Sequence, residues 1–162
     1  MAESLQELLN RLAPLLVDGS PHAMALGFTL EGLGPGNAQM RAPYRTDLVG
    51  DPETGVLHGG VVTALLDHAC GIAAFSGLGA NDTPATLDLR IDYMRPAEPG
   101  KDVVAEAECV RAHGLIAFVR AIAHDGDESD PVASAQAAFM VTRPSSEAAA
   151  KARKAIETGQ MS

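Results

Sequence analysis

The sequence predicts an α+β domain in which about five or six antiparallel strands surround one long, buried helix. Three observations support this prediction. Residues 61–75 are apolar almost all round and rich enough in alanine for a helix. Residues 86–93 alternate strictly between polar and apolar side chains, as a half-buried strand does. Residues 102–142 contain three further apolar runs that are separated by short turns.

Residues 1–20 predict a peripheral helix ahead of the main domain, which we expect over residues 21–143. Ser4 and Glu7 have the spacing of a capping box. Six leucines then follow with helical spacing, at positions 5, 8, 9, 12, 15 and 16. The helix should end near Asp18–Pro21 because glycine, serine and proline meet there.

The strands and loops of the main domain follow from apolar runs and turn residues. Before the long helix we expect strands over 23–32 and 37–43, a turn at 34–36 and a loop over 44–57. After the helix we expect strands over 86–93, 102–112, 115–124 and 131–142, with turns at 113–114 and 125–130. Residues 144–162 predict a surface helix or a frayed tail.

The alternation over residues 86–93 also predicts which side chains share a face. Thr86, Asp88, Arg90 and Asp92 should lie on one side of the strand. The apolar residues of the same run, Leu87, Leu89, Ile91 and Tyr93, should cover the long helix.

Composition restricts the classes of partner. The chain has 162 residues, of which 46% are apolar and 20% charged, and 21 acidic against 12 basic residues give a net charge of −9. An acidic surface disfavours nucleic acid and anionic membranes as main partners, so an anionic ligand needs a local basic patch. Cys70 and Cys109 match no metal-ligand spacing and predict buried free thiols in a reducing compartment. The first residues lack the pattern of a signal peptide, so we expect a cytoplasmic protein.

Asp67 is the unusual residue of the long helix, because apolar side chains surround it in the sequence. Burial of a carboxylate without partners costs several kcal/mol. One interpretation is a structural aspartate that a hydroxyl or an arginine holds, with Thr63 one helical turn back. The other is a carboxylate that serves as a general base or a nucleophile.

Gly59 and Gly60 precede this helix and are preceded by His58. Two glycines allow a ligand to approach the backbone, and the free N–H groups of a first helical turn can stabilise an oxyanion. The alternative is a glycine turn that only reverses the chain. We expect His58 to position the turn and a substrate carbonyl rather than to act as a base.

Helix geometry limits how these groups can cooperate. Nine residues separate His58 from Asp67, which corresponds to about 13.5 Å along the axis and half a turn around it. Asp67 therefore cannot meet the N-terminus of its own helix. If both act on one atom, they come from two chains, and a two-fold dimer with antiparallel helices would pair them.

Leu57-His58-Gly59-Gly60 followed by Asp67 resembles the signature of the hotdog-fold acyl-CoA thioesterases, and most of all the phenylacetate-pathway (PaaI-like) subgroup. Residues 86–97 resemble the second block of that family, and His113–Gly114 resembles its turn before a strand. The resemblance implies a curved antiparallel sheet around a central helix, and dimers that pair into homotetramers. It also implies Asp67 as the catalytic carboxylate, His58, Gly59 and Gly60 as the glycine turn, and Thr86 as a residue that positions water.

The chain departs from the family pattern at one place, and the binding of coenzyme A adds one requirement. Where relatives carry an asparagine before the histidine, this chain has Gly50–Gly55, with Asp51 or Glu53 as substitutes. Coenzyme A phosphates require arginine here, and the candidates are Arg90, Arg95, Arg111 and Arg120. The expected substrate-binding residues are Arg90, Arg95, His113 and Gly114.

The sequence thus predicts an acyl-CoA thioesterase that acts on a small-to-medium aryl- or fatty-acyl-CoA. It needs no metal and no cofactor besides the coenzyme A of the substrate. Two alternatives stay open. One is a noncatalytic acyl-CoA-binding module, and the other is a hotdog hydratase or dehydratase.

Overall fold

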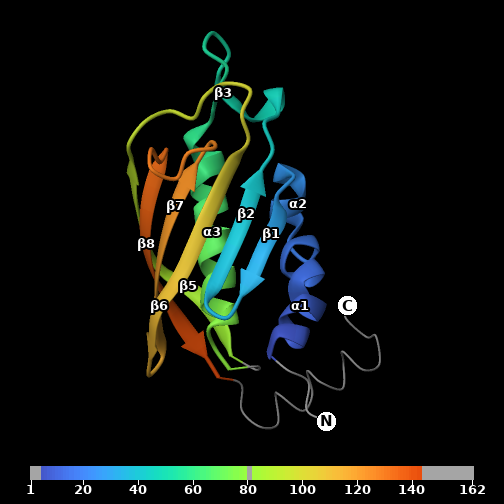
Figure 1. Cartoon of the computed structure of the whole chain (residues 1–162), viewed down its shortest axis with the longest axis vertical. Helices are drawn as coiled ribbons and strands as arrows, with labels where there is room; N and C mark the ends of the chain where they lie inside the picture. The colour runs from blue at the N-terminus through green and yellow to red at the C-terminus, as the bar shows by residue number, and fades with distance from the viewer. Residues whose placement is uncertain (1–4, 80–81, 144–162) are drawn as a thin grey trace.

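The computed structural model describes residues 5–79 and 82–143 and confirms the α+β prediction. A six-stranded antiparallel sheet packs against the central helix α3 (Gly59–Ser76), as Figure 1 shows. In spatial order the strands are β1 (Thr29–Gly34), β2 (Asn37–Ala42), β6 (Val103–His113), β7 (Ile116–His124), β8 (Ala133–Thr142) and β5 (Thr83–Tyr93). Helix α1 (Leu5–Asp18) lies beside β1, at the far edge from β5 (Figure 1).

Small side chains allow the helix to lie close to the sheet. Leu65, Leu66 and Ala73 of α3 are fully buried. The strand residues opposite the helix are mainly alanines, and Ala105, Ala117, Ala123, Ala133 and Phe139 are at most 2% exposed. Apolar burial of this kind is the main term that stabilises a domain of this size. By length and hydropathy α3 could also cross a membrane, but here it is the core helix of the sheet.

The prediction of a strand from residue 23 is wrong, because residues 21–26 form the short helix α2 (Pro21–Leu26). Ser20 caps it by accepting a hydrogen bond from the Ala23 N–H at 3.3 Å, and Pro21 occupies the first turn. Gly27 ends it at φ +73°, a conformation that favours glycine. The predicted loop over 44–57 likewise contains a single 3-10 turn, η1 (Thr46–Leu48), and the small hairpin β3 (Val49–Asp51) and β4 (Val56–Leu57).

The N-terminal helix agrees with its predicted bounds. Its predicted cap, Ser4, and the predicted C-terminal segment 144–162 lie outside the described residues. The Leu16 carbonyl in the last turn of α1 accepts a hydrogen bond from His68 Nε2 of α3 at 2.8 Å. This bond satisfies a carbonyl that a helix end leaves without an intrahelical partner.

A β-bulge in β5 changes which residues face the helix. The pairing with β8 runs from Thr86↔Phe139 to Asp88↔Ala138, so Leu87 is the extra residue. Thr86 therefore lies on the helix side, whereas Asp88 lies on the outer side. The prediction of a shared face is wrong for Thr86, and Leu87 is 51% exposed. Leu89 and Ile91 do pack against the core, as predicted.

Among the described residues nothing covers one face of α3, contrary to the prediction that strands surround a buried helix. The exposed or half-buried residues are Gly59, Gly60, Thr63, Ala64, Asp67, His68, Gly71 and Phe75. They recur every three or four positions and so form one stripe along the helix. Asp67 is therefore half-buried in one chain.

Arg95 joins two loops at the end of the sheet near the N-terminus of α3. Its Nη1 and Nη2 donate to the two carboxylate oxygens of Asp125 at 2.8 and 2.6 Å, and its Nε lies 3.0 Å from the Asp130 carboxylate. Asp125 is buried and also accepts the Glu98 N–H at 2.7 Å. The bonds from Arg95 hold the pKa of Asp125 below its usual range.

We expect Arg95→Ala to lower the free energy of unfolding by about 2–4 kcal/mol, because it leaves a buried carboxylate without its cation. Since the folded-state pKa of Asp125 is depressed, this stabilisation is complete above its unfolded pKa of about 4 and is lost progressively as the pH falls from there through the depressed folded-state pKa. Denaturant unfolding at pH 7 and pH 3 measures both effects.

The control is Arg120→Ala, which removes an exposed ion pair with Glu108. It should change the free energy of unfolding by less than about 1 kcal/mol at either pH. Equal losses for the two variants would refute the structural role of Arg95.

Candidate active site

His58 organises the N-terminus of α3. Its Nδ1 accepts a hydrogen bond from the Gly60 N–H at 2.9 Å, and its carbonyl accepts the Val61 N–H at 2.9 Å. Its own N–H donates to the Leu48 carbonyl at 2.9 Å. An Nδ1 that accepts an N–H carries no proton, so the ring is neutral with its proton on Nε2. The imidazole thus holds the turn in place.

The two glycines of the turn have different surroundings. A Cβ on Gly60 would lie 2.9 Å from His58 Nδ1, so only glycine fits beside the ring. A Cβ on Gly59 would approach nothing in its own chain more closely than the Tyr93 ring, at 3.8 Å. Within residues 5–79 and 82–143, the Gly59 N–H has no partner. Gly59 therefore offers the free donor of this helix N-terminus, where the helix dipole is positive.

A largely apolar pocket of about 370 Å³ lies beside Gly59. Its lining comes from β4, the first turn of α3, the end of β5 with the loop that follows, and Val132 just before β8; Leu57, Val62 and Met94 contribute to it, and so do the Tyr93 ring and Arg95. The free N–H of Gly59 thus borders a space whose walls are mostly apolar and include one aromatic ring.

Asp67 is held from one side. Thr86 of β5 donates to Asp67 Oδ1 at 3.0 Å, and the bulge at Leu87 is what turns Thr86 toward the helix. In the described part of the chain, no basic side chain forms an ion pair with Asp67. The predicted neighbour Thr63 donates instead to the Gly59 carbonyl at 3.1 Å. Asp67 therefore keeps its charge unpaired and the oxygen Oδ2 free.

The nearby thiol of Cys70 is not a competing nucleophile. Burial, together with the charge of Asp67, raises the pKa of Cys70 to about 12. A thiol with this pKa stays protonated near neutral pH and is unreactive. Cys109 is half-buried, and burial also raises its pKa.

Asp67 and the Gly59 N–H do not meet within one chain. Eight residues separate them, which is about 12 Å along the axis of a regular helix. Asp67 contacts the middle of β5 through Thr86, whereas Gly59 contacts the end of that strand through Tyr93. One chain thus carries the two halves of a site at separate places.

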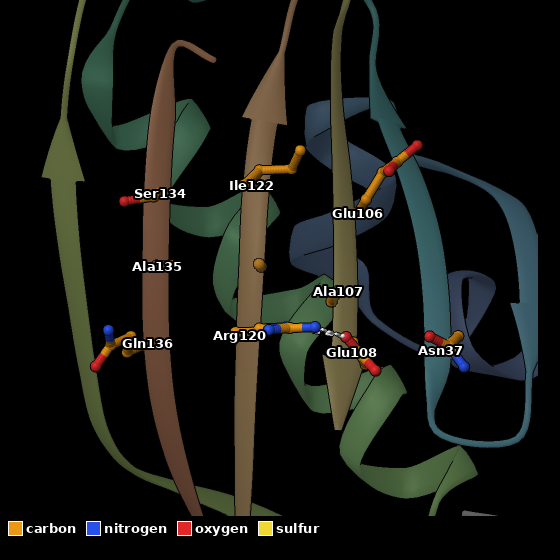
Figure 2. Close-up of a pocket in the computed structure, with 10 residues that line it drawn as sticks. Asn37, Glu106, Ala107, Glu108, Arg120, Ile122, Ser134, Ala135 and Gln136 are labelled. Atoms are coloured by element: carbon orange, nitrogen blue, oxygen red, sulfur yellow. Dashed lines mark hydrogen bonds and ion pairs between the residues drawn. The ribbon is translucent and has the colours of Figure 1, made fainter. Parts of the chain in front are cut away.

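The four predicted phosphate-binding arginines do not gather in one chain. Arg90 and Arg120 both lie opposite Gln136 in one row across the outer face of the sheet, which faces away from α3. Figure 2 shows Arg120, paired with Glu108, in a shallow pocket on this face. Arg90 lies 3.2 Å from Asp92. Arg95 is held by Asp125 as described above, so a role in phosphate binding would require it to give up those bonds.

The fourth arginine differs from the other three. Arg111 is exposed and, among the described residues, has no acidic partner. It lies on β6 just after a bulge and opposite Phe118 of β7. Arg111 therefore has the freest guanidinium of the predicted set.

The turn between β6 and β7 is Gly114–Leu115, one residue later than predicted, and His113 ends β6 opposite Ile116. Gly114 has φ +62°, which a two-residue hairpin of this kind requires. Cys109 of β6, four residues before His113, packs against Gly77 at the C-terminal end of α3. The turn thus lies at the opposite end of the helix from Gly59, as Figure 1 also shows.

Asp51 and Glu53, the predicted substitutes for an asparagine, belong to the β3–β4 hairpin. Asp51 accepts the Glu53 N–H at 3.1 Å and the Thr54 hydroxyl at 2.8 Å. The side chains of Asp51 and Glu53 are both exposed. The nearby Gly50 packs on His58, where a Cβ would lie 2.9 Å from its Cα.

The sequence reasoning missed the role of the Tyr93 hydroxyl. It donates to the Gly59 carbonyl at 2.8 Å and lies 2.6 Å from Thr63 Oγ1. The alternation of residues 86–93 placed Tyr93 toward the helix, but no spacing in the sequence connects it to Gly59.

A separate cluster of possible metal ligands comprises Glu106, His124 and Glu128, whose ligand atoms lie within 4.8 Å of one another. His124 is buried, and its Nδ1 accepts the Gly126 N–H at 3.3 Å. The ring therefore keeps its proton on Nε2, which is the atom that faces Glu106 at 3.8 Å. A protonated Nε2 offers no lone pair to a metal, so we assign no metal to this cluster.

Comparison with known proteins places the fold and the glycine turn in a family. The family model described as "Thioesterase superfamily" matches residues 54–132, which include His58, Gly59, Gly60 and Asp67. The medium/long-chain acyl-CoA thioesterase YigI of Escherichia coli is 31% identical over 149 residues, which cover 84% of this chain and 95% of YigI.

Solved structures agree. A Pseudomonas aeruginosa protein is 42% identical with a TM-score of 0.74, over 82% of this chain and 98% of that one. The phenylacetic acid degradation protein PaaI of Thermus thermophilus, solved as a mutant, is 30% identical with a TM-score of 0.65, over 77% of this chain and all of that one. The chain therefore belongs to the thioesterase superfamily, as a hotdog-fold thioester hydrolase of the PaaI-like subgroup.

Proposed function

We propose that this protein hydrolyses acyl-CoA thioesters at a site made from Asp67 of one chain and the Gly59 N–H of another. The observation that carries the proposal is that the chain has both a carboxylate without a cation and a backbone N–H without an acceptor among the described residues. Asp67 has an unpaired charge with one oxygen held by Thr86, and Gly59 has an N–H without a partner among the described residues. Such groups can supply a base and an oxyanion donor.

Two features of the chain favour a dimer. The stripe of α3 that includes Thr63, Asp67 and Gly71 is not covered by the described part of its own chain. The adjacent β5 is an 11-residue edge strand, with Leu87 and Tyr93 about half exposed. Long edge strands of this kind pair with other chains unless they are protected. An antiparallel pair of α3 helices would bring each Asp67 to the glycine turn of the second copy. Following the family resemblance, we propose a dimer of dimers.

The chemistry follows from the atoms available. The Gly59 N–H would bind the thioester oxygen and stabilise the charge that develops on it. Asp67 Oδ2 would take a proton from water, while the Thr86 hydroxyl holds Oδ1 and so orients the carboxylate. Attack of Asp67 itself on the carbonyl, with later hydrolysis of the anhydride, uses the same groups. The thiolate leaves without a strong acid, and we propose no cofactor or metal.

For the acyl group we propose a small-to-medium aryl or fatty chain. The mostly apolar pocket beside Gly59 suits either chain, and of the two a fatty chain agrees better with the printed name of YigI. The coenzyme A phosphates need a cation on an otherwise acidic surface, and Arg111 is the freest candidate. Two free cysteines suit action in the reducing cytoplasm.

The decisive variant is Asp67→Asn. It removes the base but keeps an oxygen that can accept the Thr86 hydroxyl, so the melting temperature should be unchanged. The rate of thiol release from acyl-CoA substrates should fall by at least about 10². Asp88→Asn, an exposed acid on the outer face of β5, is the control and should behave as wild type. Retained activity in Asp67→Asn would show that another group catalyses the reaction, whereas a wild-type protein that releases no thiol would favour a noncatalytic acyl-CoA-binding module.

Mixed oligomers test whether two chains share the site. An Asp67→Asn chain co-expressed with a Gly59→Ala chain should regain up to about half of the wild-type activity, because one of the two sites in the mixed dimer then has both groups intact. Sites built within single chains would stay inactive in the mixture.

Thr86→Ala tests the orientation of the carboxylate. Loss of one hydrogen bond to a charged group should lower kcat roughly tenfold, about 1.4 kcal/mol, with a small change in stability. Thr86→Ser keeps the hydroxyl and should retain most of the activity. Thr83→Ala removes an exposed hydroxyl from the same strand and should have no effect on kcat. Equal kcat values for all three variants would leave Thr86 as an ordinary strand residue.

The two glycines should respond in opposite ways to alanine. Gly60→Ala places a methyl group against His58 Nδ1, and loss of the cap should cost about 1–2 kcal/mol of stability. Gly59→Ala has room in its own chain and should not reduce stability, yet its methyl group stands where the thioester must approach. Thiol release and thermal unfolding of both variants decide this, and an active Gly59→Ala enzyme would remove Gly59 from the site.

A further inference from the structure

Two hydroxyl groups converge on one backbone carbonyl in the first turn of α3. Tyr93 Oη donates to the Gly59 oxygen at 2.8 Å, and Thr63 Oγ1 donates to the same oxygen at 3.1 Å. The two hydroxyls also lie 2.6 Å apart; each has one proton, so when one donates to the other, only the accepting hydroxyl donates to the Gly59 oxygen. Tyr93 comes from the end of β5, so these bonds join the edge strand to the start of the helix.

This convergence exceeds what a helix needs for its stability. A first-turn carbonyl already accepts the N–H four residues later, so Gly59 requires no further donor. Tyr93 is 50% exposed, so water could satisfy its hydroxyl without the Gly59 carbonyl. The bonds therefore have another effect, which is to restrain the peptide planes on which they act.

The restraint matters because glycine has the most backbone freedom of any residue. The peptide before Gly59 is held by the bond between the Val61 N–H and the His58 carbonyl. The peptide after Gly59 is held at its N–H by His58 Nδ1 and at its oxygen by the two hydroxyls. With both planes held, the free N–H of Gly59 has a defined direction. Catalytic donors act best when they need no reorganisation during the reaction.

We propose that Tyr93 is a positioning residue, which acts through the Gly59 carbonyl to hold the Gly59 N–H in the direction required for thioester hydrolysis, with Thr63 as its second hydroxyl. This inference rests on the proposed function for its catalytic consequence. The restraint of the Gly59–Gly60 peptide stands independently of it.

The test compares Tyr93→Phe with Tyr44→Phe in the full chain. Tyr44 is the other tyrosine, and its hydroxyl also donates to a glycine carbonyl, that of Gly55 at 2.9 Å. Tyr93→Phe should lower kcat about three- to tenfold, which is the range expected for one neutral hydrogen bond. KM should stay within about twofold because Tyr93→Phe keeps the ring that lines the pocket beside Gly59 and removes only a hydroxyl that bonds to protein atoms. Tyr44→Phe should leave kcat unchanged.

A second measurement follows the backbone directly. Exchange of the Gly60 amide hydrogen, measured by NMR, should become at least about threefold faster in Tyr93→Phe and should be unchanged in Tyr44→Phe. Thr63→Val should reproduce part of both effects, and Thr63→Ser, which keeps the hydroxyl, should restore wild-type values.

The outcomes distinguish the positioning role of Tyr93 from the proposed thioester hydrolysis. An unchanged kcat and an unchanged Gly60 exchange rate in Tyr93→Phe would overturn the positioning role. A change in KM alone would also overturn the positioning role, because the Tyr93 hydroxyl would then act by binding the substrate. If the wild-type protein released no thiol from any acyl-CoA, the proposed function would fail, while the exchange rates would still show whether the hydroxyls restrain the turn.

Discussion

The rigidity of one helix governs the rest of this structure. An α-helix rises about 1.5 Å per residue, so α3 holds Asp67 and the Gly59 N–H about 12 Å apart and cannot bend to join them. The alanine-lined sheet fixes α3 along most of its length and leaves one stripe of it open. That stripe carries Asp67. The same rigidity that separates the two groups in one chain would place them with precision in a pair of chains.

The turn that opens α3 combines a flexible sequence with a restrained structure. Two successive glycines have little intrinsic preference for any one conformation. His58 restrains them from one side through a neutral ring and its backbone, and Tyr93 and Thr63 restrain them from the other. Gly60 is a glycine because His58 needs its space, whereas no described residue of the chain explains the absence of a side chain at Gly59. This difference points to a ligand or a second chain as the reason.

Charged residues have different roles on the outer face of the sheet, at its end and on the helix face. On the outer face, Arg90 and Arg120 lie beside acids and are mostly exposed, so their ion pairs add little to stability. At the end of the sheet, Arg95 and buried Asp125 form a pair that joins two loops. On the helix face, Asp67 has a hydroxyl partner and, among the described residues, no cation. An unpaired carboxylate retains its capacity to accept a proton, which a paired one loses.

Periodicity and local composition were sufficient to predict the long apolar helix, the succession of strands after it and Asp67 as the exceptional residue. Most of the strand bounds after α3 agree with the structure to within a few residues, and the separation of Asp67 from Gly59 followed from helix geometry alone. The family resemblance rested on a local pattern, His58–Gly60 followed by Asp67, which a single chain displays in full.

Other features depend on contacts between segments that are distant in the sequence, and local patterns could not predict them. The bulge at Leu87 turned Thr86 toward Asp67, and period-two alternation cannot reveal where a strand gains a residue. Arg95 was bound by Asp125, which lies 30 residues away, so its charge alone could not show whether it was free for phosphate. Tyr93 reached the carbonyl of Gly59 across 34 residues, and α2 replaced a predicted strand because capping by Ser20 and Gly27 outweighed a weak apolar pattern. In each case the deciding interaction joins residues whose proximity exists only after the chain has folded.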